Sequence, residues 1–121
     1  MAEEKNIRTI ISEVSSELRD NLDLLDSVSA SKKLVMLASL KSSLNAYIAK
    51  YDGICRQKFY EILRSQEKRN VASAKVELEA TDEAIELNAA KLQNDALKEL
   101  IASLKYFQKA NTDDALNQRN L

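Results

Sequence analysis

Apolar residues recur every three or four positions along most of the chain, the spacing that places them on one face of an α-helix. A first stripe predicts a helix over about residues 6–28. A second predicts a longer helix over about 32–69, roughly 55 Å long if unbroken. A third predicts a helix over about 82–110. The three stripes consist of Ile7, Ile11, Val14, Leu18, Leu22, Leu25 and Val28, then Leu34, Leu37, Leu40, Leu44, Tyr47, Ile48, Tyr51, Ile54, Cys55, Phe59 and Ile62, and finally Ile85, Ala89, Leu92, Ala96, Leu100, Leu104 and Phe107.

The segments between the stripes predict where the helices end. The serine-rich stretch 27–31 interrupts the first stripe, and Ser29 or Ser31 can cap the helix that follows by accepting a bond from a free backbone amide. Residues 70–80 alternate apolar and polar positions with a period of two. That spacing is typical of an extended linker or a short strand edge, although a continued helix stays open as an alternative.

Polar residues mark both ends of the third predicted helix. Thr81 is placed to cap its start, with Asp82 and Glu83 in the first turn, where negative charge suits the helix dipole. Asn111 is a plausible stop, after which the tail 111–121 either holds one more helical turn or is flexible.

Gly53 is the single glycine of the chain, and there is no proline. The second stripe passes through Gly53 without losing phase, which favours an interior glycine, with or without a kink, costing about 1 kcal/mol relative to alanine. A loop at residues 51–53 is the alternative.

The prediction is therefore an all-α chain forming one domain over residues 1–121. Its three main helices pack as an antiparallel bundle or a long helical hairpin, coiled-coil-like and oligomeric. Ala, Glu, Lys, Leu and Arg fill 61 of the 121 positions, a composition typical of long helices and coiled coils. The expected core positions are Leu18, Leu25, Leu37, Leu44, Tyr51, Ile62, Leu92, Leu100 and Leu104.

The inventory of reactive residues argues against an enzyme. With no histidine, the commonest general base and metal ligand is missing, and one glycine cannot build a phosphate-binding loop. Cys55 lies on an apolar stripe, where a buried, inert thiol is expected. We therefore predict no catalytic residue, no metal site and no cofactor. No apolar run is long enough for a membrane span, and the acidic N-terminus is unlike a signal peptide, so the expected location is the cytoplasm.

Charge is distributed unevenly along the chain. Residues 1–31 hold seven acids and three bases (net −4), residues 32–75 hold ten bases and three acids (net +7), and residues 76–121 hold nine acids and five bases (net −4). Electrostatic matching of a basic helix with two acidic neighbours is the simplest interpretation. A second interpretation is a basic surface for nucleic acid, because several bases of the middle segment point away from the apolar stripe. Its candidate binding residues are Lys50, Arg56, Arg64 and Lys68.

The stretch VASAKVELEATDE followed by AIELNAAKLQNDALKELIASLKYFQKA resembles the small helical recombination mediators of tailed phages, the UvsY-like proteins. The similarity covers about residues 32–110 and consists of the order of a basic helical stretch, a short alternating segment and an acid-capped helix. It implies a ring-forming accessory protein that binds single-stranded DNA and helps to load a recombinase. The family's basic binding helix would fall on Arg56, Lys58, Arg64, Lys68 and Arg69.

Three functions follow as hypotheses. The first is a non-enzymatic, self-associating accessory or adaptor protein that acts through protein–protein contacts. The second is the phage-type mediator that binds single-stranded nucleic acid. The third is a small helical chaperone or secretion partner of another protein. All three predict a homo-oligomer or a protein complex, and none involves a membrane.

Overall fold

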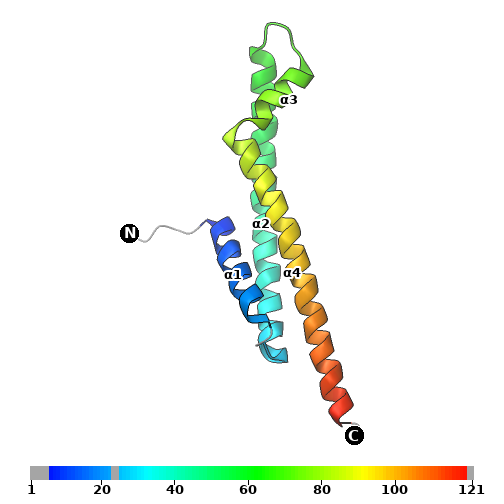
Figure 1. The fold of residues 1–121 in the computed structure, drawn as a ribbon. Helices are drawn as coiled ribbons and strands as arrows, with labels where there is room; N and C mark the ends of the chain where they lie inside the picture. The colour runs from blue at the N-terminus through cyan, green and yellow to red at the C-terminus, as the bar shows by residue number, and fades with distance from the viewer. Residues whose placement is uncertain (1–5, 23–24, 120–121) are drawn as a thin grey trace, which may run out of the picture.

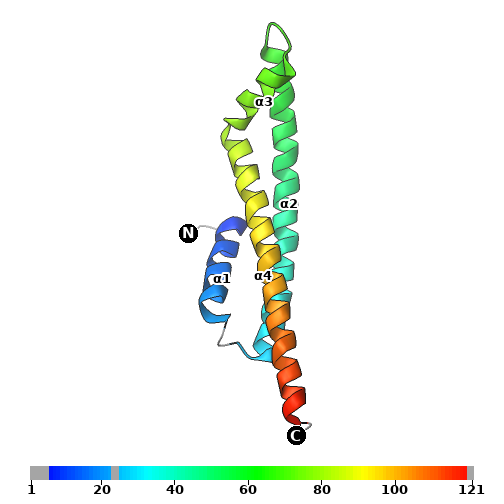
Figure 2. The same ribbon diagram turned by 45° about the vertical axis from the view of Figure 1, so that its right-hand side comes forward.

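The computed structural model describes residues 6–22 and 25–119, with side chains for all of these except 27 and 111–119. The described chain is helical and contains no strand, which confirms the all-α prediction. It has four helices, α1 (Ile7–Asn21), α2 (Ser27–Ser65), α3 (Val71–Glu79) and α4 (Asp82–Arg119), so the prediction of three was wrong. The long helices α2 and α4 form an antiparallel hairpin, α3 lies near its closed end, and α1 packs against one side of it (Figures 1 and 2).

The boundary between the first two helices differs from the sequence prediction. α1 ends at Asn21, and α2 already begins at Ser27, so residues 27–31 lie inside α2 instead of separating two helices. The cap of α2 is Asp26, whose carboxylate accepts a hydrogen bond of 2.7 Å from the amide of Ser29. An aspartate is at least as good a cap as a serine, and this bond holds the pKa of Asp26 below its usual value. The cap prediction for Ser29 or Ser31 was therefore wrong.

The segment predicted as a linker is a helix. Asn70 caps α3 by accepting a hydrogen bond of 3.2 Å from the amide of Ser73. Ala74 is buried and Leu78 half-buried, so one side of this short helix packs against the hairpin. Val76 is exposed although it is apolar, so the period of two in the sequence corresponds neither to an extended backbone nor to one buried face. α2 ends at Ser65, four residues before the predicted end at 69.

The start of α4 confirms the predicted cap, and its end does not confirm the predicted stop. The Thr81 hydroxyl accepts a hydrogen bond of 3.3 Å from the amide of Ala84, and Asp82 and Glu83 lie in the first turn. The helix continues past Asn111 to Arg119, so most of the predicted tail is helical. Gly53 lies within the unbroken α2, which excludes the alternative of a loop at 51–53.

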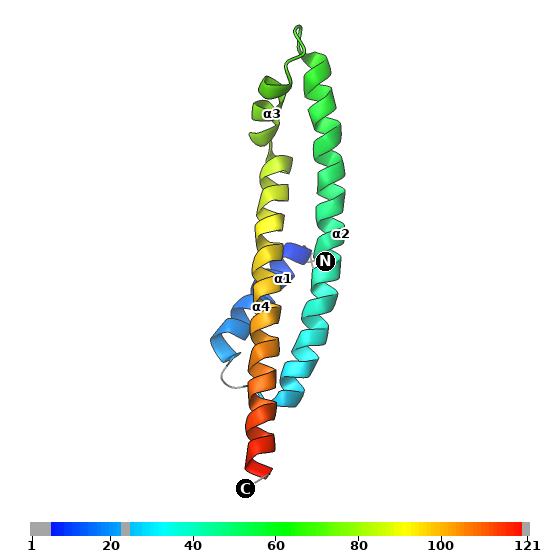
Figure 3. The same ribbon diagram turned by 90° about the vertical axis from the view of Figure 1, so that its right-hand side faces the viewer.

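The core runs along the seam between α2 and α4 and is completed by α1. Figure 3 shows α2 and α4 side by side over most of their length. Of the nine predicted core residues, Leu18, Leu37, Leu44, Leu100 and Leu104 are buried, and Leu25, Tyr51 and Ile62 are half-buried. The buried cluster consists of Ile11, Leu18, Ala30, Leu37, Leu44, Ala90, Leu97, Leu100 and Leu104.

Leu92 is the one predicted core residue that the structure places on the surface, with 64% of its area exposed. The first half of α4 carries two neighbouring apolar lines. Leu87, Ala90 and Leu97 face α2 and are buried, whereas Ile85, Ala89 and Leu92 lie on the adjacent side. The sequence prediction placed the second line in the core, whereas in the structure α2 packs against the first line.

Candidate interaction surfaces

A polar junction joins the N-terminal end of α1 to both long helices. The Glu86 carboxylate of α4 accepts hydrogen bonds from Arg8 Nη1 at 2.7 and 2.8 Å and from the Tyr47 hydroxyl of α2 at 2.7 Å. Gln93 extends the junction, because its Nε2 donates to the Arg8 carbonyl oxygen at 2.8 Å and its Oε1 accepts from Arg8 Nε at 3.3 Å. Asn6, the α1 cap, accepts from the amide of Arg8 at 2.9 Å. The junction therefore fixes where α1 begins on the hairpin.

The junction shifts the titration of two of its members. The Arg8 guanidinium, followed by the Tyr47 hydroxyl, holds the pKa of the Glu86 carboxyl below its usual range. Burial, followed by the hydrogen bond to the Glu86 carboxylate, raises the pKa of Tyr47 to about 12. Both shifts favour an ionised Glu86 beside a neutral Tyr47, which is the state that makes the most hydrogen bonds. The junction therefore holds the N-terminal end of α1 in place on the hairpin.

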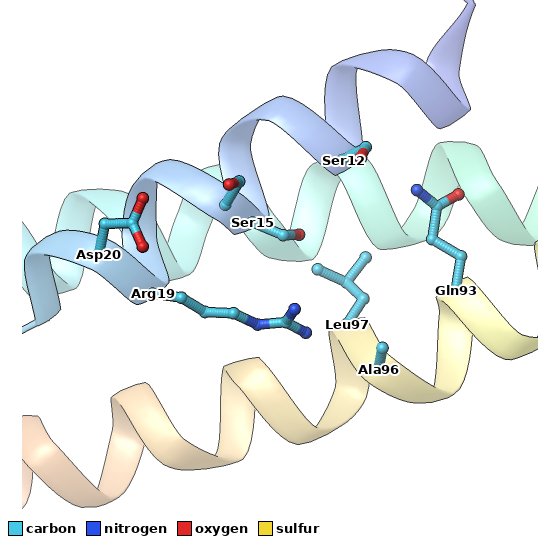
Figure 4. A pocket seen from close by; sticks show the side chains of 8 residues that line it. Ser12, Ser15, Arg19, Asp20, Gln93, Ala96 and Leu97 are labelled. Carbon is cyan, nitrogen blue, oxygen red and sulfur yellow. The ribbon is translucent and has the colours of Figure 1, made fainter.

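Between α1 and α4 lies a narrow crevice of about 330 Å³. Figure 4 shows Arg19 reaching from α1 across it, with Leu97 and Ala96 of α4 nearby and Asp20 pointing away. The serine residues of α1 make much of its wall polar: Ser12, Ser15 and Ser16. The crevice marks the edge of the α1 contact with α4.

The apolar line of α4 that faces away from α2 forms the first surface of interest, which we call the α4 flank: Ile85, Ala89 and Leu92. These residues line an open hollow of about 570 Å³ near the turn between α3 and α4. Ile85 is 57% exposed and Leu92 is 64% exposed. Four residues further on, Ala96 lines the crevice against α1. The α4 flank is therefore the uncovered continuation of the side of α4 against which α1 packs.

A second hollow lies on the seam between α2 and α4, and none of the residues that line it comes from α1. We call it the lysine groove: Lys41, Lys98 and Lys105 around a floor of Ala38, Ile101 and Ala102. Its volume is about 530 Å³, and Ser42 and Asn45 complete its lining. The Lys41 ammonium donates to Asn94 Oδ1 at 3.2 Å, a neutral partner. Among the described residues, none of the three ammonium groups has a carboxylate oxygen within 4 Å.

The structure does not gather the four bases predicted to bind nucleic acid into one row. Lys50, Arg56 and Arg64 are exposed on α2, but Lys68 lies beyond its C-terminal end. Lys50 and Arg64 share a side of the helix about 21 Å apart, whereas Arg56 lies about 120° around the axis from Lys50. Arg56 also forms an ion pair with Asp52 at 3.1 Å.

The bases that the phage resemblance adds are similarly dispersed. Lys58 forms an ion pair of 2.8 Å with Glu83 of α4. Hydrogen bonding to Glu83 raises the pKa of Lys58, and the same contact lowers the pKa of Glu83. Lys58 therefore helps to hold the two long helices together. Arg69, like Lys68, lies in the connection between α2 and α3.

Cys55 is buried, as the apolar stripe predicted. Burial, followed by the charge of Asp52, raises the pKa of its thiol, so the reactive thiolate is disfavoured. Within residues 6–22 and 25–119, no three His, Cys, Asp or Glu side chains come together as a metal site. Over the same residues, no helix has both the length and the apolar character needed to cross a bilayer.

Comparison of the chain with family models, with curated proteins and with solved structures finds no match. The resemblance to phage recombination mediators therefore remains one of sequence pattern.

Sequence reasoning missed both the α4 flank as a surface and the lysine groove. Lys91, Lys98 and Lys105 recur at intervals of seven residues, a signal visible in the sequence. This spacing did not lead to a predicted basic site, because the net charge of the C-terminal segment is negative. The contribution of Lys41 could not be foreseen, since it depends on how α2 packs against α4.

Proposed function

We propose that this protein is a non-enzymatic helical accessory protein that self-associates and acts through protein–protein contacts. The observation that carries the proposal is the α4 flank, where Ile85 and Leu92 expose more than half of their area on a continuous helix face. Clustered apolar side chains of this kind mark interaction sites more often than isolated ones do. Ala89 lies between them, and its small side chain lets a second helix approach closely.

The predicted helix over 32–69 is longer than either neighbour, so the sequence alone favours self-association through the part of its stripe that one chain would leave uncovered. In the structure, α3 and α4 together cover α2 along most of its length (Figure 3). The predicted stripe of α2 is buried or half-buried throughout, whereas Ile85 and Leu92 of the predicted α4 stripe are exposed.

The area of the α4 flank sets the expected strength of the contact. Fully burying a Leu or Ile side chain is worth about 1.5–3 kcal/mol, so four such side chains, each about 60% exposed, supply about 4–7 kcal/mol to a two-fold pair. Association costs about 4 kcal/mol or more in lost freedom. The α4 flank alone therefore leaves at most about 3 kcal/mol of net association free energy, so self-association at about 1 mM or below requires further surface beside it.

Sedimentation or light scattering tests the proposal from about 10 µM to about 1 mM, which brackets association free energies of about −7 to −4 kcal/mol. The expected result is a mass that rises above the 13.6 kDa of one chain with concentration. Leu92→Glu should return the protein to one chain at every concentration. Val35→Glu is the matched control, because Val35 is equally exposed but lies on α2. A constant mass of 13.6 kDa, or self-association that Leu92→Glu leaves unchanged, would refute the proposal.

Binding of single-stranded nucleic acid is the second candidate function. It is supported by the exposure of Lys50 and Arg64 on one side of α2 and by the sequence resemblance. Two bases about 21 Å apart give weak binding that falls steeply with salt, so several copies would have to act together. The test is fluorescence anisotropy with a labelled oligonucleotide across a salt series, comparing the native protein with Lys50→Glu/Arg64→Glu. Equal signals from the two proteins would remove this candidate.

A further inference from the structure

The lysine groove combines an apolar floor with uncompensated positive charge on both walls. Lys41 stands on the α2 wall, and Lys98 and Lys105 stand on the α4 wall. Between them, Ile101 is half-buried, and Ala38 and Ala102 are exposed but small. Three positive charges around one hollow make its potential positive, which favours an anionic occupant.

We propose that the lysine groove binds an acidic amphipathic helix of a partner protein. The inference deepens the proposed function by naming the kind of partner that an adaptor of this shape holds, and it rests on that function. The groove uses a different side of α4 from the α4 flank, so partner binding and self-association involve separate residues. One chain can therefore do both at once.

The spacing of the lysines favours a helical occupant. Lys98 and Lys105 are seven residues apart on α4, which separates them by about 10.5 Å along the axis. A helix lying along the groove presents acidic side chains on one flank at the same interval. Both walls then meet a carboxylate row, since Lys41 faces the opposite flank of the guest.

The floor of the groove favours an apolar contact beneath these charges. Ala38 and Ala102 leave room for a Leu or Ile of the guest to reach Ile101. This is how an amphipathic helix occupies a groove between two helices, with apolar anchors below and charges at the rim. A purely ionic ligand would leave Ile101 and both alanines in contact with water.

Two other occupants fit the groove less well. None of its lining residues is aromatic, so it offers no platform on which an unpaired base could stack. A second copy docking groove to groove would bring lysines against lysines. Charge complementarity thus selects an acidic partner helix.

A pair of synthetic helices tests the proposal. The acidic peptide has three heptads with Leu at the two core positions and Glu at the two flanking positions, whose repulsion limits its self-pairing. The basic peptide carries Lys in place of Glu. Binding of each to the full chain is measured by fluorescence anisotropy at several salt concentrations. The native protein should bind the acidic peptide, more weakly as salt rises, and should ignore the basic one.

Charge reversal in the groove gives the decisive comparison. Lys98→Glu/Lys105→Glu replaces two attractive contacts with two repulsive ones, so affinity for the acidic peptide should fall about tenfold or more. The same variant should gain binding to the basic peptide. Lys50→Glu/Arg64→Glu makes an equal change of charge on the outer face of α2 and should bind as the native protein does. Circular dichroism confirms that each variant keeps its helical content.

Two further measurements distinguish binding at the lysine groove from binding at the α4 flank and from binding of nucleic acid. Leu92→Glu should abolish self-association and keep peptide binding. If Leu92→Glu also abolishes peptide binding, the site is the α4 flank and the proposal fails. The proposal also fails if the native protein does not bind the acidic peptide, or if Lys98→Glu/Lys105→Glu leaves that binding unchanged. A labelled single-stranded oligonucleotide that binds through Lys98 and Lys105 while the acidic peptide does not would assign the groove to nucleic acid instead.

Discussion

Replacing Glu86 with alanine should release α1 from the hairpin. Glu86 accepts two hydrogen bonds from Arg8 of α1 and one from Tyr47 of α2, and these three bonds have donor–acceptor distances of 2.7–2.8 Å. The variant leaves a guanidinium and a phenol without their acceptor in a partly buried place. α1 buries only two large side chains completely or nearly so, Ile11 and Leu18, so it depends strongly on this junction.

The expected magnitude follows from the contacts and their exposure. A hydrogen bond to a charged group contributes about 1.5–3 kcal/mol, and a neutral one about 1 kcal/mol. The Arg8 and Glu86 side chains are 27% and 29% exposed, so water replaces part of what is lost. We expect Glu86→Ala to cost about 1.5–3 kcal/mol, because solvent screening reduces the sum of the individual bonds. At about 3–6 °C per kcal/mol for a chain of this size, Tm falls by about 5–18 °C.

Thermal unfolding and amide hydrogen exchange measure the two parts of this effect. Tm reports the global loss, and exchange of the α1 amides should accelerate more than that of α2, since α1 loses its anchor first. Glu99→Ala is the matched control, because Glu99 is an exposed acid of the same helix. A double-mutant cycle with Arg8→Ala should show coupling of about 0.5–2 kcal/mol between Arg8 and Glu86. Additive effects, or α1 exchange no faster than in the control, would show that the junction does not hold α1.

Two other outcomes follow from the same coordinates. Gly53→Ala should stabilise the protein by about 1 kcal/mol in denaturant unfolding, because Gly53 is interior to α2 and an added Cβ meets nothing within 4 Å; a loss of stability would indicate a contact at that site in an assembly. Stability measured against pH should fall on both sides of a plateau. Because the pKa of Glu86 is lowered in the folded protein, the contribution of Glu86 to stability is complete above the ordinary pKa of 4.5. This contribution is lost as pH falls through the folded-state pKa. The raised pKa of Tyr47 makes its contribution complete below 10.0 and lost as pH rises through about 12; in Glu86→Ala both dependences should weaken.

The periodicity of apolar residues predicted the helices better than it predicted their ends. The stripes of α2 and α4 are long and regular, so both helices were found, and the start of α4 at Asp82 was correct, whereas α2 begins at Ser27 and not at 32. Their boundaries depend on single side chains that compete for the same role. Asp26 and Ser29 could each cap α2, and in the structure Asp26 does so by accepting a hydrogen bond from the Ser29 amide. Asn70 likewise converts an alternating segment into α3 by capping it, although nine residues form a marginal helix alone.

The choice of candidate binding residues shows a different limit of sequence reasoning. Counting charge by segment made the middle of the chain basic, so its exposed bases were chosen as candidates. The structure shows that Arg56 and Lys58 are engaged with Asp52 and Glu83. Among the described residues, Lys98 and Lys105 have no carboxylate partner although they belong to the segment with a net charge of −4, and Lys50 and Arg64 have none either. Whether a base is available depends on its neighbours in space, which net charge along the sequence does not record.

The two apolar lines of α4 connect the error about Leu92 with the proposed function. A helix that packs against one partner needs a single apolar stripe, and Leu87, Ala90 and Leu97 supply it. From Leu100 onward, α1 and α2 together bury most of the apolar surface of α4 as far as Leu104. Between residues 85 and 92, α1 meets α4 through Arg8 at Glu86, whereas Ile85 and Leu92 on the second line stay more than half exposed. The exposed second line is therefore the surface on which the proposed self-association depends, and Leu92→Glu tests that link.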